Sequence, residues 1–133
     1  MADPVSLTLG ITPLVISALS AYTAIYGKFQ TYRQYSRAIL RLHRQFETQR
    51  RLFLNECHFL LRLVVSDEHT IRAMLANPKH TKWTDSSINR RWKKCLEANY
   101  DTCLKIVEEI DEGLTELRKE LNQFDSIQAQ RQV

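Results

Sequence analysis

The sequence predicts an all-α protein: a helical bundle with two long antiparallel helices, an apolar N-terminal helix and two short connecting helices. The chain has 133 residues but only three glycines and three prolines, too few turn residues for a sheet protein. Apolar residues recur at helical spacing along most of its length. We therefore expect a single domain over residues 1–125, followed by a frayed polar tail over residues 126–133.

The first element is an uncharged stretch over residues 4–27, which precedes a chain with a charge every few residues. Asp3-Pro4 and Thr12-Pro13 each place a capping residue before proline, as at a helix start. We expect a short helix over residues 4–9, a break at Gly10 and a second helix over residues 13–26.

This apolar stretch has three interpretations. As a helix, 24 uncharged residues would reach roughly 36 Å, enough for a hydrocarbon core of about 30 Å. Serines and threonines dilute it, however, and Asp3 stands where a signal peptide would be basic. A buried bundle helix is favoured over a permanent membrane span, with conditional insertion as the third alternative. The residues expected to enter a membrane are Leu14, Val15, Ile16, Leu19, Tyr22 and Ile25.

Residues 28–65 contain neither glycine nor proline and predict one long helix. Its apolar residues recur every seven positions, at Tyr32, Ile39, Phe46, Phe53 and Leu60. The first half of this helix is rich in arginine and should have a solvent-exposed face. If this face meets anionic lipid, the contacts are Arg33, Arg37, Arg41 and Arg44.

Two short helices should follow. Asp67 can cap a helix over residues 68–76, which Asn77-Pro78 would end. Residues 79–85 form the main loop, with Trp83 packed back on the bundle. Thr84 or Asp85 would cap the next helix, over residues 86–97.

The last helix shows the cleanest pattern in the chain, with spacings of three and four over eight apolar residues: Tyr100, Cys103, Val107, Ile110, Leu114, Leu117, Leu121 and Phe124. Such a seam is typical of helix pairing. Asn99 is a candidate cap. We expect this helix to pack antiparallel against the helix over 28–65, with the N-terminal segment covering the remaining groove.

Charge is unevenly distributed. The net charge is +6 over residues 28–62, +5 over residues 79–94 and −5 over residues 101–125. The acidic last helix can lie beside the basic ones and partly cancel their field. Alternatively, a basic face is kept for anionic lipid or another acidic partner.

No motif predicts catalysis or a cofactor, and the four histidines are not at metal-ligand spacings. We expect no enzyme. The three cysteines lack a C-x-x-C spacing, which indicates free thiols and a cytoplasmic protein. A basic patch with Trp83 and Trp92 makes nucleic-acid binding a weak alternative, less favoured than a solvated helix face with two core tryptophans.

Several stretches carry a family resemblance: Met1–Ser6 with Gly10, the run Pro13–Leu19, Leu75–Pro78, Trp83, and the final Leu114, Leu117 and Leu121. In this order they resemble the HeLo and HeLo-like N-terminal domains of fungal cell-death and incompatibility proteins. They are also similar to the N-terminal region of fungal proteins with a degenerate kinase-like domain. The resemblance implies a helical bundle whose apolar N-terminal helix is released on activation and enters the plasma membrane. It implies no catalytic residue.

The expected function is therefore a membrane-targeting, cell-death-type effector or signalling bundle whose N-terminal segment inserts into membrane. It would be cytoplasmic and relocate to the plasma membrane. Expected partners are an anionic membrane on activation, further copies of the chain, and an upstream receptor or partner helix; nucleic acid is not favoured. The alternative is a non-catalytic protein-interaction domain for adaptor binding or oligomerisation.

Overall fold

The computed structural model describes residues 10–32 and 37–131, without the side chains of residues 124–131. Within these ranges the chain is all-α, as predicted, and contains no strand. The elements are α2 (Ile11–Tyr32), α3 (Arg37–Arg62), α4 (Glu68–Ala76), a 3-10 turn η1 (Thr81–Thr84), α5 (Ser87–Leu96) and α6 (Asn99–Arg131).

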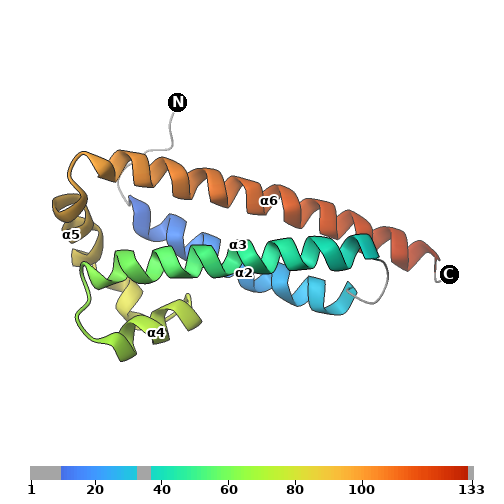
Figure 1. Cartoon of the computed structure of the whole chain (residues 1–133), viewed down its shortest axis with the longest axis horizontal. Helices are drawn as coiled ribbons and strands as arrows, with labels where there is room; N and C mark the ends of the chain where they lie inside the picture. The colour runs from blue at the N-terminus through green and yellow to red at the C-terminus, as the bar shows by residue number, and fades with distance from the viewer. Residues whose placement is uncertain (1–9, 33–36, 132–133) are drawn as a thin grey trace.

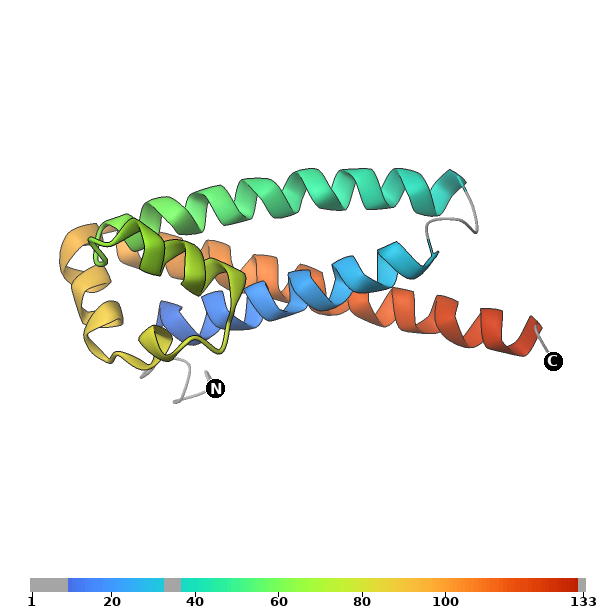
Figure 2. The same cartoon turned by 90° about the horizontal axis from the view of Figure 1, so that it is seen from below.

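Three long helices make up the body of the bundle (Figure 1). Helix α2 and helix α6 run in the same direction, and α3 runs back beside them. The short elements α4, η1 and α5 gather at the end where α3 finishes and α6 begins. Figure 2 shows α2 and α6 close together with α3 on one side of this pair, and the tightest packing in the molecule is between α2 and α6.

Helix α2 supplies much of the core, as expected for a buried N-terminal helix. Its buried side chains recur at helical spacing: Ile11, Val15, Ala18, Leu19, Tyr22, Ile25, Phe29 and Tyr32. Tyr22 stacks obliquely between the rings of Phe46 and Phe53 of α3, at centroid distances of 5.4 and 5.1 Å. The apolar stripe of α2 is therefore shared by α3 and α6.

The limits of α2 differ from the prediction. The break at Gly10 is confirmed, because its φ of +71° lies in the left-handed region that favours glycine. The helix begins at Ile11 rather than Pro13 because Asn89 of α5 supplies the cap: its Oδ1 accepts a hydrogen bond from the Ile11 N–H at 3.1 Å. The helix predicted over residues 4–9 lies outside the described residues.

The single helix predicted over residues 28–65 is wrong. The stretch from Lys28 to Tyr32 continues α2, and α3 starts at Arg37. Because α3 runs back along α2, its Phe46 packs against Tyr22 and Phe29 of α2, which one straight helix could not achieve. The ring of Phe29 accordingly lies 5.3 Å from that of Phe46.

The seam of α6 is confirmed, but its predicted partner is wrong. Every seventh residue from Tyr100 to Leu121 is buried, and the alternate positions Cys103, Ile110 and Leu117 are half-buried; the side chain of Phe124 lies outside the described residues. This seam packs chiefly on α2, not on the helix over 28–65. The physical reason is that α2 has a buried apolar stripe along its whole length and can approach α6 closely.

The short elements agree with the sequence. Asp67 caps α4 by accepting a hydrogen bond from the His69 N–H. Trp83 packs back on the bundle and donates its indole N–H to the Met74 carbonyl at 3.0 Å. Asp85 accepts from the Ser87 N–H at the start of α5, as one of the two predicted caps. Trp92, fully buried, donates to the Leu60 carbonyl at 2.8 Å and fixes α5 against α3.

Candidate functional site

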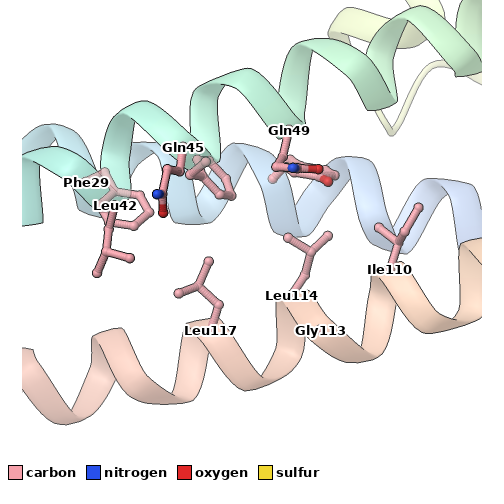
Figure 3. A pocket seen from close by; sticks show the side chains of 10 residues that line it. Phe29, Leu42, Gln45, Gln49, Ile110, Gly113, Leu114 and Leu117 are labelled. Carbon is pink, nitrogen blue, oxygen red and sulfur yellow. The ribbon is translucent and has the colours of Figure 1, made fainter.

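An apolar groove separates α3 from α6 on one side of the bundle (Figure 3). The two helices flank α2 without closing over it, which leaves two adjoining hollows of about 540 and 470 Å³. Both hollows are lined by Tyr22 of α2, Gln49 of α3 and Ile110 of α6, so they form one continuous groove. Tyr22 and Phe29 of α2 lie at its base. We call this feature the α3–α6 groove.

The α3 wall carries a second helical stripe, distinct from the one that packs on α2. Its members are spaced by threes and fours: Leu42, Gln45, Gln49, Leu52, Glu56, Phe59 and Leu63. Its four apolar members are 45–58% exposed and are among the five large apolar side chains that are exposed in the described structure. Leu42, Gln45, Gln49, Leu52 and Glu56 line the groove. Phe59 continues the stripe towards the end of α3 at Arg62, and Leu63 directly follows the helix. Such spacing is that of a helix-pairing face.

The α6 wall has the same periodicity. Its members are Cys103, Ile106, Ile110, Gly113 and Leu117, which all line the groove. Ile106 is 52% exposed. A side chain at Gly113 would meet no atom within 4 Å, so this glycine leaves a hollow in the wall. The groove therefore has two helical walls with apolar faces that no described element covers.

The two walls carry opposite charge. Helix α3 has six arginines and two glutamates, whereas α6 has eight acidic and four basic residues, giving net charges of +4 and −4. Within the described residues, ion pairs form inside α3, α4, α6 and the η1 turn, and between His58 of α3 and Glu68 of α4. Among the residues whose side chains are described, no ion pair joins α3 to α6. The opposite charges of the walls are thus left for another partner or for solvent.

The residues predicted to insert into membrane all lie on α2. Val15, Leu19, Tyr22 and Ile25 are buried in the bundle, and Leu14 and Ile16 are half-buried. Among the described helices, none is long and apolar enough to cross a membrane. In this structure the predicted insertion residues therefore pack in the core.

The predicted lipid-binding arginines lie on α3. Arg37, Arg41 and Arg44 are exposed and form no ion pair with any described residue, and Arg33 lies outside the described residues. Arg37, Arg41 and Arg44 share one side of the helix, next to the groove-facing stripe. They could meet an anionic surface or the acidic face of another helix.

Two cysteine thiols have pKa values that burial raises. Burial raises the pKa of the Cys57 thiol to about 12, with smaller contributions from Cys103 and Glu56, and burial also raises the pKa of Cys103. Both thiols are therefore weak nucleophiles at neutral pH. No group of histidine, cysteine or acidic side chains in the described residues could hold a metal ion.

Sequence reasoning did not identify the groove, although a signal was present. The two apolar stripes of α3 overlap in sequence, and the second is interrupted by Gln45, Gln49 and Glu56. A search for a second heptad pattern in the same segment would have found it. Comparison of the chain with protein-family models, with curated proteins and with solved structures found no match. The resemblance to HeLo-like domains stays a prediction.

Proposed function

We propose that the protein is a non-catalytic interaction module that binds an amphipathic helix in the α3–α6 groove. The observation that carries this proposal is the pair of unpartnered helical stripes that face each other across the groove. A contiguous exposed apolar surface rimmed by polar residues is typical of an interaction site. The groove concentrates such surface along α3 and α6, on the side of α2 that these helices leave open.

The shape of the groove favours a helix as the ligand. Its walls are two helices with three-and-four spacing, and its floor is a third helix. A fourth helix laid along it would complete a four-helix arrangement, with side chains interdigitating on both walls. Helix-in-groove binding of this kind uses apolar anchors at helical spacing. The ligand helix should carry acidic residues on the edge beside α3 and basic residues on the edge beside α6.

A direct test uses a synthetic amphipathic helix of about three heptads with glutamates along one edge and lysines along the other. Its binding to the full chain can be followed by fluorescence anisotropy. Ile106→Glu places a carboxylate in the groove at an exposed position, so binding should fall while the fold remains. Ser20→Glu adds the same charge on an exposed position of α2 outside the groove and should bind as the parent does. Equal binding by the parent and by Ile106→Glu would contradict the groove assignment.

A membrane-targeting, cell-death-type role, resembling that of HeLo-like domains, is the second candidate. It is favoured by the exposed, unpaired arginines of α3 and by the uncharged stretch that includes the first part of α2. In this proposal the protein is cytoplasmic, moves to an anionic plasma membrane and inserts α2. The energetics are demanding: eight side chains of α2 are buried, at roughly 1.5–3 kcal/mol each, which is on the order of the whole stability of a domain. Release of α2 would therefore unfold the bundle unless membrane or a partner compensates.

Charged substitutions on α2 separate the two candidates. A charge near the centre of an inserted helix costs about 2.5–3.5 kcal/mol on insertion scales, but little at an exposed bundle position. Ser20→Glu should therefore keep the parent melting temperature and abolish dye release from anionic liposomes. Ser17→Lys is a less clean probe, because the Ser17 hydroxyl donates to the Asp111 carboxylate at 2.9 Å.

The result of the liposome experiment is decisive for the second candidate. If the parent releases dye and Ser20→Glu does so equally well, α2 does not insert. If the parent releases no dye from anionic liposomes, the membrane role is refuted and the interaction role is untouched. Ile106→Glu serves as the opposite control, since it blocks the groove and leaves α2 unchanged.

A further inference from the structure

We propose that the helix bound in the α3–α6 groove is α3 of a second copy of this chain, so that the protein is a two-fold symmetric dimer. This inference rests on the proposed function of the groove and names its partner. In a two-fold dimer the same surface serves both copies. Each α3 must then be a suitable ligand for the groove and also one of its walls.

The exposed stripe of α3 meets the first requirement. Four of its seven members are large apolar side chains that remain 45–58% exposed. When two such stripes run antiparallel, Leu42 of one copy lies opposite Phe59 of the other, and Gln45 lies opposite Glu56. Leu42 and Phe59 then meet at both ends of the contact, Gln45 meets Glu56, and Leu52 lies opposite Gln49 at its centre. A Gln45 amide can donate to a Glu56 carboxylate, which satisfies both groups.

The α6 wall also fits this partner. In Figure 3, Leu117 of α6 lies across the groove from Leu42 and Gln45 of α3, and Leu114 lies across from Gln49. An antiparallel second α3 would place its Phe59 at the level of Leu42, beside Leu117 of α6. Its Leu52 would lie at the level of Gln49, near Leu114. The exposed side chains of both walls would thus be buried together.

Charge complementarity points in the same direction. The inserted α3 carries a net charge of +4, and the α6 that it would follow carries −4. Arg41 lies on the same edge of α3 as Phe59, because the two are separated by a whole number of helical turns. This edge would face α6 of the other copy. Two-fold symmetry repeats this contact between α3 of one copy and α6 of the other, while the two basic α3 helices present Gln45 and Glu56 to each other.

The oligomeric state of the full chain tests the proposal by sedimentation equilibrium. At about 10–100 μM, where a dissociation constant in the micromolar range gives assembly, the parent should sediment at twice the chain mass of 15.6 kDa. Phe59→Asp should sediment as a monomer. Phe59 is 58% exposed, so the Phe59→Asp variant should still fold and show a cooperative melting curve. Dissociation should increase with salt, since opposite charges meet across the interface.

A matched pair of substitutions tests the antiparallel arrangement. Gln45→Lys places an ammonium opposite Glu56 of the other copy, whereas Gln45→Glu places a second carboxylate there. We expect the dimer of Gln45→Glu to be about tenfold weaker than that of Gln45→Lys. The glutamate repels Glu56 of the other copy, whereas the lysine attracts it, and two-fold symmetry repeats the contact at a second site. Both positions are exposed in one copy, so its stability should change little. Equal dimer affinities for the two variants would refute the antiparallel arrangement.

The remaining outcomes separate this inference from the function on which it rests. Suppose that the parent chain stays monomeric, and that the synthetic helix binds the parent but not Ile106→Glu. A second copy is then not the ligand, whereas the proposed function of the groove stands. A monomeric parent that binds no helix overturns both. A dimer that Phe59→Asp and Ile106→Glu leave intact uses another surface and also overturns the inference.

Discussion

We predict that the side chain of Asn89 holds the start of α2 in position. Its Oδ1 accepts hydrogen bonds from the Ile11 N–H at 3.1 Å and from the Tyr100 hydroxyl at 2.8 Å. One residue of α5 therefore joins the first residue of α2 to the first turn of α6. Asn89→Ala removes the acceptor and leaves both partly buried donors without it. A lost cap costs about 1 kcal/mol and an unsatisfied buried donor about 1–3 kcal/mol, so we expect a loss of roughly 2–4 kcal/mol.

The assay is urea unfolding followed by circular dichroism, compared between Asn89→Ala and Asn89→Asp. The aspartate keeps an acceptor oxygen and adds a negative charge at the N-terminus of α2, where the helix dipole favours it. Asn89→Asp should therefore be at least close to the parent in stability. Amide exchange at Ile11 should speed up in the alanine variant alone. The reasoning is refuted if Asn89→Ala unfolds within about 0.5 kcal/mol of the parent, which is the scatter of ordinary surface substitutions.

Three further predictions concern the core and its polar groups. Leu114→Ala should cost about 2–5 kcal/mol in urea unfolding, since Leu114 is buried in the seam of α6; tolerance of Leu114→Asp would contradict the seam. The exposed Cys95 thiol should react with a disulfide reagent in the native protein, whereas Cys57, whose pKa burial raises to about 12, should react only on unfolding. Hydrogen bonds from Ser87, and then Lys82, lower the pKa of Asp85 to about 2. Its stabilising effect should be complete above about pH 4, the range of a free carboxyl, and fade as pH falls towards 2; Asp85→Asn should flatten this part of the pH–stability curve.

The sequence predicted which faces are buried better than what covers them. The register of α6 followed from its spacing, because a seam of three and four allows only one buried face. The helix against which α6 packs could not be predicted in this way, since the spacing of a seam does not indicate which surface it contacts. Two candidates had matching periodicity, and α2, in which Lys28 is the one charged residue, packs against α6 where the arginine-rich helix was expected. The long-range link between Asn89 and Ile11 had no sequence signal, because the two residues are 78 positions apart.

The boundary between α2 and α3 was missed for a local reason. No glycine or proline marks it, so periodicity was extended through residues 33–36. Ser36 directly precedes the first residue of α3, and serine is a favoured residue before a helix. This signal was weaker than the unbroken heptad from Tyr32 to Leu60. Yet Tyr32 belongs to α2 and the later members belong to α3, so the regular spacing across the boundary did not reflect one helix.

The sequence alone could not choose between core and membrane for α2, because both environments favour the same apolar stripe. The structure adds contacts that only the bundle can supply. The Ile11 N–H is capped by Asn89, Ser17 donates to Asp111 of α6, and Phe29 stacks on His43 of α3 at a centroid distance of 5.5 Å. A bilayer offers α2 apolar burial but none of these partners. For this reason the groove, which binds a ligand without moving α2, requires less free energy than insertion and is the better-supported site.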